Sequence, residues 1–280
     1  MIRIDNLDFA YDQPVLTRFS VGIAPGRIYG LLGKNGEGKS TLLQLICGML
    51  RPAHGVITID GYDTRERAPE LLQELFIVPE EMHLPNISLM DYVRVNAVFY
   101  PRFSQEQMEE YLAVFGYRKD VNFGALSMGE RKKVFLSFAL ATNTRYLLMD
   151  EPTNGLDIPS KNFFRKVLMQ AMNEQRTVII STHQVRDIDA LLDHLLVIND
   201  GRLLIDHSVS EICDRLSFYE VGVDADLSGV IYAIPSIHGS YVVRPFIGEH
   251  TKLNLELFFT AVLGATDDLI KALNAPSQRA

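Results

Sequence analysis

The chain is poor in cysteine, contains no long apolar segment and has no excess of basic residues. Its two cysteines, Cys47 and Cys213, lie far apart and form no metal-binding or redox motif, which fits a reducing cytosol. The longest apolar stretches, Val134–Ala141 and Leu257–Ala265, are much shorter than the ~20 residues that span a bilayer. The N-terminus has no apolar run of signal-peptide length, so we expect no secretion.

The charge balance gives no support to a nucleic-acid partner. The formal net charge is -8 at pH 7, and no sustained basic stripe offsets it. Apolar residues make up 47% and charged residues 22% of the 280 positions, as in ordinary globular proteins, and this length allows one large domain or two. We therefore expect a cytoplasmic globular protein.

The segment Gly30–Thr41 reads GLLGKNGEGKST and combines four glycines with two lysines. It follows an expected strand at 27–32 and precedes an expected helix at 41–50, so its pattern Gly33-x4-Gly38-Lys39-Ser40 is that of a P-loop. Glycines let backbone N–H groups surround a polyphosphate, and a helix N-terminus adds positive potential. A chance glycine-rich loop is the alternative, and the flanking strand and helix argue against it. The expected nucleotide-binding residues are Gly33, Lys34, Asn35, Gly36, Glu37, Gly38, Lys39, Ser40 and Thr41, with Ser40 also on magnesium.

A second apolar segment, Tyr146–Asp150, ends on an acid and is followed by Glu151. Ligands of α/β sheets bind at the carboxyl ends of the strands, so we expect Asp150 to reach magnesium and Glu151 to polarise a water that attacks the γ-phosphate. The alternative for Glu151 is a surface acid in an ion pair.

The remaining periodicity alternates between strands and helices. Residues 82–140 are helical in character, and Ser104 and Gln107 match a capping box. The further expected elements are a hairpin at 55–61, parallel strands at 146–150 and 177–182 around a helix at Ile158–Gln175, a hairpin at 195–206, short strands after 217, and a helical ending at Asn254–Asn274. We expect residues 275–280 to fray.

Three further motifs carry a resemblance to a family. They are LSMGE at 126–130, DEPTNGLD at 150–157 and STH at 181–183. Together with the P-loop, these motifs closely resemble the ATP-binding subunits of ABC transporters over residues 1–216. The resemblance implies an α/β fold: a P-loop NTPase core with a parallel sheet, an antiparallel β subdomain and a helical subdomain at about 82–140. Residues 219–280 are expected to form a small C-terminal α+β accessory domain.

The resemblance also implies roles for single residues. Tyr11 is expected to stack on adenine, with simple packing as the alternative. His183 is expected to contact the γ-phosphate, with a structural histidine as the alternative. Ser127 and Gly129 would complete the ATP site of an opposite subunit, and Asp157 would line the seam between the two copies. Ser127-x-x-Glu130 also reads as a capping box that opens a helix.

The chain departs from the family pattern at three motif positions. Glu80 stands where the family has a glutamine, and we expect it to contact magnesium; the alternative is that it swings away and serves only the subunit contact. The segment LSMGE at 126–130 matches the family's signature LSGGQ, in which Met128 and Glu130 replace a glycine and a glutamine, which suggests weaker or slower closure rather than inactivity.

The resemblance implies ATP and Mg2+ as cofactors, and a membrane permease and a second ATP-binding subunit, identical or different, as partners. The chain would then lie on the inner face of the cell membrane. The helical segment 82–115 would receive a permease helix, with candidates Leu84, Ile87, Leu89 and Tyr92. The C-terminal part resembles the tail of many bacterial exporter subunits, which favours export. The alternatives are a soluble ABC-type ATPase not linked to transport and a nucleotide-dependent regulatory protein; Glu151 and His183 speak against the latter.

Overall fold

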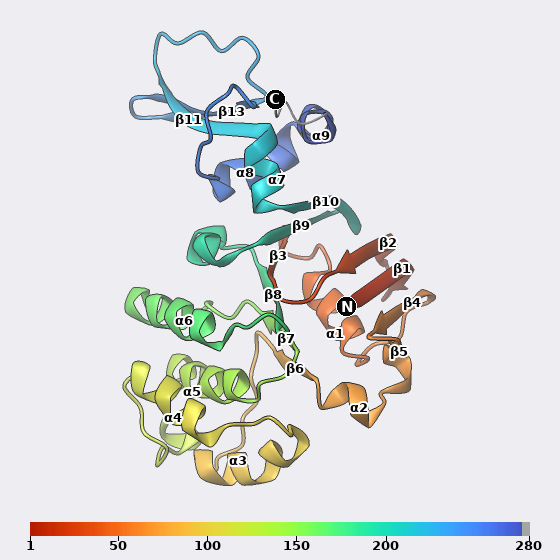
Figure 1. The fold of residues 1–280 in the computed structure, drawn as a ribbon, viewed down its shortest axis with the longest axis vertical. Helices are drawn as coiled ribbons and strands as arrows, with labels where there is room; N and C mark the ends of the chain where they lie inside the picture. Colours follow the sequence, from red (N-terminus) through yellow and green to blue (C-terminus); the bar gives the residue numbers. More distant parts are fainter. Residues whose placement is uncertain (276–280) are drawn as a thin grey trace.

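The computed structural model describes residues 1–275, so the fraying expected at 276–280 lies outside the described part. Residues 1–275 form three β-sheets: an antiparallel sheet lies beside the central sheet, and the C-terminal sheet lies at one end of the long axis (Figure 1). Among residues 1–275, no helix has both the length and the apolar character that a bilayer crossing requires.

The central sheet has six strands in the order β10-β9-β3-β8-β7-β6. Its strands are β3 (Ile28–Leu32), β6 (Leu75–Val78), β7 (Tyr146–Asp150), β8 (Thr177–Thr182), β9 (His194–Asn199) and β10 (Arg202–Ser208). All neighbours are parallel except β9 and β10, which form the predicted hairpin. Every residue of β3, β7 and β8 is buried, which confirms the predicted buried parallel strands. Because these strands run in one direction, the segments that follow them meet at the same edge of the sheet.

A second, antiparallel sheet has the order β2-β1-β4-β5. Its strands are β1 (Ile2–Ala10), β2 (Pro14–Ile23), β4 (His54–Ile59) and β5 (Tyr62–Asp63). Helix α1 (Lys39–Ile46) packs in the same apolar cluster as residues of both sheets. The helix ends four residues before the predicted Leu50, because Gly48 adopts a left-handed conformation with φ +63°. A Cβ there would lie 2.2 Å from the carbonyl oxygen of Thr64.

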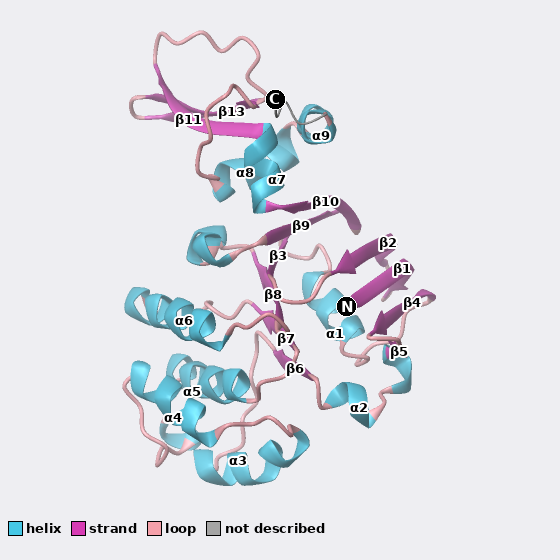
Figure 2. Cartoon of the chain, viewed as in Figure 1, coloured by secondary structure: helices cyan, strands magenta, loops and turns pink. Residues whose placement is uncertain are grey.

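Most of the other helices gather on the side of the central sheet opposite β1, β2 and β4 (Figure 2). They are α3 (Leu89–Asn96), α4 (Gln105–Val114), α5 (Met128–Ala141) and α6 (Ile158–Ala171), with the short α2 (Pro69–Leu72) before them. Ser104 caps α4, but the reciprocal half of the predicted capping box is absent. Helix α6 ends before the predicted Gln175, because the Asn173 side chain accepts hydrogen bonds from the N–H groups of Gln175 and Arg176.

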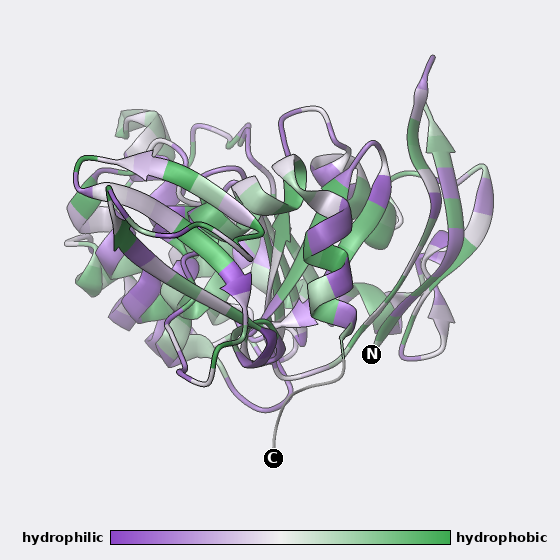
Figure 3. Ribbon diagram, turned by 90° about the horizontal axis from the view of Figure 1, so that it is seen from above, coloured by the Kyte–Doolittle hydropathy of each residue, from purple (hydrophilic) through white to green (hydrophobic). Residues whose placement is uncertain are grey.

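The C-terminal part contains a three-stranded antiparallel sheet and helices. The elements are α7 (Val209–Arg215), β11 (Leu216–Gly222), β12 (Tyr232–Ser236), β13 (Gly239–Pro245), α8 (Leu255–Gly264) and α9 (Thr266–Asn274), and the strand order is β11-β13-β12. The predicted helical ending is thus two helices, because the backbone leaves the helical region at Ala265. Apolar residues of this part share one buried cluster with the central sheet and its helices. Figure 3 colours the ribbon by hydropathy and shows green, hydrophobic segments in the middle of the molecule. The division into residues 1–216 and 219–280 stays a prediction.

Candidate functional site

The loop after β3 is closed by its own lysine. The Lys39 side chain is buried, and its Nζ donates to the carbonyl oxygens of Gly33 at 2.9 Å and Lys34 at 3.0 Å. Burial lowers the pKa of Lys39, and the negative charges of Glu151 and Asp150 oppose this shift. Gly36 and Gly38 adopt left-handed conformations with φ of +87° and +91°, which the turn of the backbone around the loop requires. The P-loop glycines therefore serve the backbone geometry for which the sequence suggested them.

A cavity of about 410 Å3 brings most of the predicted site residues together, whereas Gly33, Lys34, Glu37 and Asp150 do not line it. Its walls come from the P-loop, from residues before β2 and from the segments that follow β6, β7 and β8. The lining residues are Tyr11, Val15, Asn35, Gly36, Gly38, Lys39, Ser40, Thr41, Glu80, Glu151 and His183. Tyr11 is 61% exposed and packs the edge of its ring on Phe9, with 4.9 Å between ring centroids. Its position at the cavity wall is compatible with a stacking role, and that role stays a prediction.

Glu151 is buried and fixed by its neighbours. Its Oε1 accepts from the backbone N–H of His183 at 3.0 Å and lies 2.7 Å from His183 Nδ1, and its Oε2 accepts from Thr182 Oγ1 at 3.1 Å. The backbone of Glu151 is left-handed, with φ +44°. The alternative of an exposed surface ion pair for Glu151 is therefore wrong.

Asp150 lies at the end of β7 and is buried. Its carboxylate accepts a hydrogen bond from the hydroxyl of Ser181 on β8. Ser40, Asp150 and Glu80 offer one hydroxyl and two carboxylates, which is the oxygen donor set that Mg2+ prefers. Glu80 Oε1 accepts from Asn154 Nδ2 at 3.0 Å, so the position at which the family has a glutamine contacts the turn after Glu151.

The signature segment lies away from this cavity. Ser127 caps α5, and both bonds of the predicted capping box are present: Ser127 N–H donates to Glu130 Oε2 at 2.9 Å, and Glu130 N–H donates to Ser127 Oγ at 3.4 Å. Gly129 lines a neighbouring cavity of about 560 Å3, which shares Glu80 with the P-loop cavity, and Met128 is 78% exposed. Ser127 and Gly129 are thus outside the P-loop cavity of their own chain, and their role across a dimer stays a prediction.

Asp157 caps a helix as well. Its Oδ1 accepts from the Ser160 N–H at 3.0 Å at the start of α6, and it lies 3.9 Å from Lys133 Nζ. The side chain is 65% exposed, so capping leaves it accessible at the surface. Its placement in a subunit seam stays a prediction.

A groove of about 710 Å3 is lined by residues of α2, β6 and α3 and by the segment 98–100. Tyr92, Val98 and Phe99 line it, and the side chains of Val98 and Phe99 are 74% and 64% exposed. Of the four predicted docking residues, only Tyr92 lines this groove. Leu89 does not, because it is completely buried in the core. Leu84 packs partly buried against that core and does not line the groove.

Two buried cations near the site were not predicted from the sequence. Lys132 is 4% exposed and Arg176 is 1% exposed. Lys132 lies at the helical spacing of the buried Leu136 and Ala139, and a lysine on the apolar face of a helix is a signal that the sequence does carry. Arg176 donates to three backbone carbonyls, and burial lowers its pKa to about 10.

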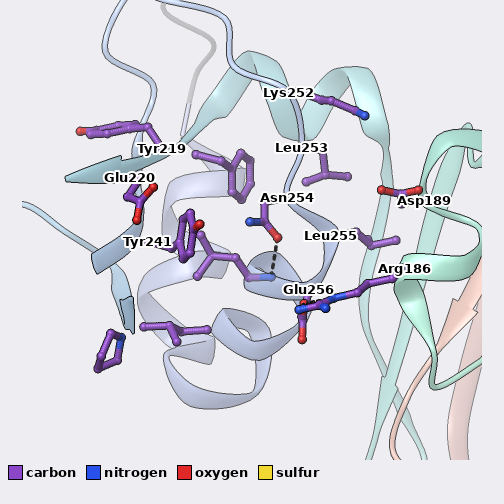
Figure 4. Close-up of a pocket in the computed structure, with 14 residues that line it drawn as sticks. Arg186, Asp189, Tyr219, Glu220, Tyr241, Lys252, Leu253, Asn254, Leu255 and Glu256 are labelled. Atoms are coloured by element: carbon purple, nitrogen blue, oxygen red, sulfur yellow. Dashed lines mark hydrogen bonds and ion pairs between the residues drawn. The ribbon is translucent and has the colours of Figure 1, made fainter. Parts of the chain in front are cut away.

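The C-terminal part contacts the segment that follows His183. Arg186 forms an ion pair with Glu256 at the start of α8 and borders a cavity of about 670 Å3 (Figure 4). Tyr241 and Asn254 also line it, and the Asn254 side chain caps α8 by accepting from the Leu257 N–H at 3.0 Å. No local pattern of residues predicts this contact, because it joins positions 70 residues apart.

Comparisons with known proteins agree on one family. A family model described as "ABC transporter" matches residues 16–154. The ABC transporter ATP-binding protein NatA of Bacillus subtilis is 34% identical over 192 residues, which cover 66% of this chain and 78% of NatA. The Nod factor export ATP-binding protein I of Cupriavidus metallidurans is 29% identical over 219 residues, with coverages of 76% and 71%.

The solved structures agree on the fold. One described as the dimeric structure of a bacterial ABC transporter cassette superposes with a TM-score of 0.65 at 21% identity, covering 74% of this chain and 98% of that chain. The predicted α/β architecture is confirmed by the sheets described above and by this likeness. With a P-loop, a buried acid pair and a signature segment in family order, the chain belongs to the ATP-binding proteins of the ABC transporter family.

Proposed function

We propose that this chain binds ATP with magnesium and hydrolyses it at the interface of two ATP-binding subunits, to drive export through a separate membrane permease. The observation that carries the proposal is the division of the expected ATP ligands. The P-loop, Glu151 and His183 line one cavity and Gly129 lines a neighbouring one, with Glu80 on the wall of both. A site of this kind is complete only when a second subunit supplies the signature.

The P-loop would bind the triphosphate. Its backbone N–H groups and the N-terminus of α1 favour a polyphosphate, and Lys39 would exchange its two carbonyl acceptors for phosphate oxygens. Magnesium would be held by Ser40 and Asp150, with Glu80 as a further oxygen donor, and would neutralise charge on the phosphates.

Glu151 is the proposed general base. Its carboxylate is held on one side by Thr182 and on the other by His183, so its orientation is fixed before a water is deprotonated. His183 shares the cavity wall and would contact the γ-phosphate. Ser127 and Gly129 at the exposed N-terminus of α5 would contact the same phosphate from the opposite subunit, because a helix N-terminus favours anions.

The groove beside Tyr92, Val98 and Phe99 supports a permease partner. Two large apolar side chains there are exposed, which is typical of interaction surfaces. The relative named for Nod factor export supports export as the direction. A chain docked in this way would lie on the inner face of the cell membrane.

The proposal is tested by the assembly state. Light scattering behind size exclusion, with Mg2+ and a non-hydrolysable ATP analogue, should give a dimer that dissociates when nucleotide is removed. Ser127→Arg should bind the analogue and remain a monomer, because the arginine blocks the signature face. A parent protein that stays monomeric at saturating analogue would contradict the shared site.

The permease arm is tested by co-purification from membranes. Val98→Asp together with Phe99→Asp should abolish recovery of a multi-span membrane protein without changing nucleotide binding. Recovery equal to that of the parent would contradict this groove as the docking site. Turnover without any membrane partner would favour the ATPase that is not linked to transport.

A further inference from the structure

Lys132 is a buried cation whose hydrogen-bond acceptors are backbone carbonyls. Its Nζ donates to the carbonyl oxygens of Glu151 at 2.7 Å and Asn154 at 3.1 Å. Within residues 1–275, no carboxylate forms an ion pair with it, although the side chain is only 4% exposed. Burial of an ammonium without a paired carboxylate is costly, so the two carbonyl contacts need a structural reason.

The first carbonyl belongs to a backbone position that needs support. Glu151 has φ +44°, a conformation that residues other than glycine rarely adopt. Its N–H donates to the Ser181 carbonyl oxygen at 3.1 Å, and its own carbonyl accepts from both Lys132 Nζ and the Asn154 N–H at 3.1 Å. Lys132 therefore holds the carbonyl side of the residue proposed as the base, while β8 holds its N–H side.

The second carbonyl connects Lys132 to Glu80. The Asn154 side chain donates to Glu80 Oε1 at 3.0 Å, while its backbone carbonyl accepts from Lys132. Burial lowers the pKa of Lys132, and the negative charges of Glu80, Glu151 and Asp150 oppose that shift. The carboxylate that replaces the family's glutamine thus favours the charged form of this buried lysine.

Lys132 also lies on the helix that carries the signature. It is three residues after Gly129 on α5, and the N-terminus of that helix approaches the same turn closely. A Cβ at Gly129 would lie 3.0 Å from the carbonyl oxygen of Gly155. Helix α5 and the turn 151–155 are therefore in contact through backbone packing and through the ammonium.

We propose that Lys132 is a positioning residue, which ties helix α5 to the turn 151–154 and, through Asn154, to Glu80. The signature end of α5 and the base Glu151 then move as one unit, although the proposed function assigns them to different ATP molecules. This inference rests on the proposed function for the roles of Glu151 and Ser127. The contacts of Lys132 themselves do not depend on it.

The first test needs no nucleotide. Hydrogen exchange of the peptides that cover 151–157 is compared in the parent, Lys132→Met and Lys132→Arg, with Lys166→Met as control, since Lys166 is exposed on the neighbouring helix α6. We expect exchange in this turn to rise at least tenfold in Lys132→Met, to recover in part in Lys132→Arg, and to stay at the parental rate in Lys166→Met. Unchanged exchange in Lys132→Met would overturn the proposal.

The second test separates positioning from binding. A misplaced base lowers turnover without weakening the P-loop, so kcat of Lys132→Met should fall about 10- to 100-fold while KM for ATP stays within about threefold. A raised KM with unchanged kcat would overturn the assignment. If Lys132→Met does not fold, Lys132→Gln, which keeps a neutral donor, must show the same rise in exchange and the same kcat loss in smaller measure. An inactive parent would contradict the proposed function, and the exchange experiment would still decide on Lys132.

Discussion

Replacing Glu151 by glutamine separates catalysis from folding at this site. The substitution keeps the shape of the side chain and removes its negative charge. Glu151 Oε1 accepts from the His183 N–H, so a glutamine must keep its carbonyl oxygen there. Its NH2 group then takes the place of Oε2 and faces Thr182 Oγ1, whose hydroxyl can turn and accept. That hydroxyl already accepts from the Gln184 N–H, so its own proton loses its acceptor, and we expect the free energy of unfolding to fall by about 1–2 kcal/mol.

The loss in turnover should be much larger. An amide cannot take a proton from water, and a positioned general base contributes about 10^2- to 10^4-fold to the rate. This range corresponds to about 2.7–5.4 kcal/mol in the activation free energy, at 1.36 kcal/mol for each factor of ten. Steady-state phosphate release at saturating ATP measures the loss, and binding of a fluorescent ATP analogue checks that the site still accepts nucleotide.

Glu81, in the segment after β6, offers a matched control. Glu81 is exposed and lies next to Glu80, so Glu81→Gln changes the same charge without altering Glu151 and should retain parental turnover within about threefold. If Glu151→Gln kept more than a third of the parental kcat while folded and able to bind the analogue, Glu151 would not be the base. The regulatory alternative with little hydrolysis would then gain support.

Four further results follow from the described contacts. Lys39→Met should weaken ATP binding by about 10- to 100-fold in calorimetric titration, because it removes a charged donor from the phosphates. Arg176→Met should lower the free energy of urea unfolding by about 3–5 kcal/mol, because three backbone carbonyls lose a buried donor; a change below 1 kcal/mol would contradict this. Glu80→Gln should shift the magnesium dependence of turnover, and an unaltered dependence would argue against Glu80 as a metal ligand. Burial raises the pKa of Cys47 to about 12, which disfavours its reactive thiolate. At pH 8 an aromatic disulfide reagent should therefore label the partly exposed Cys213 first. Faster labelling of Cys47 would mean that α1 opens readily.

The parts of the fold that the sequence could predict are those with local signals. The P-loop, the buried strands and the Asn199–Gly201 turn follow from residue type and spacing within a few positions, and the structure has them. Helix ends were less predictable, because they depend on single contacts. The left-handed Gly48 ends α1, and the hydrogen bonds of the Asn173 side chain prevent α6 from continuing to Gln175. Each of these residues permits several conformations in isolation, and the tertiary environment selects one.

At the site, residues that belong to a motif were predictable and residues without a motif were not. That Tyr11, Glu80, Glu151 and His183 lie together could be predicted because each belongs to a motif with a fixed place in the chain, and the four line one cavity. Lys132 has no such motif, and its importance appears only when the turn after β7 lies against α5. The separation of the signature from the P-loop cavity likewise follows from the path of the chain between β6 and β7 rather than from spacing.

The contact between the C-terminal part and the residues after His183 limits how far that histidine can move independently. The 3-10 turn Val185–Asp187 packs against α8, and Arg186 is bound to Glu256. A shift of His183 would therefore either displace α8 as well or break the ion pair between Arg186 and Glu256. Loss of the last helices at the far end of the molecule would in turn alter the mobility of the imidazole beside Glu151.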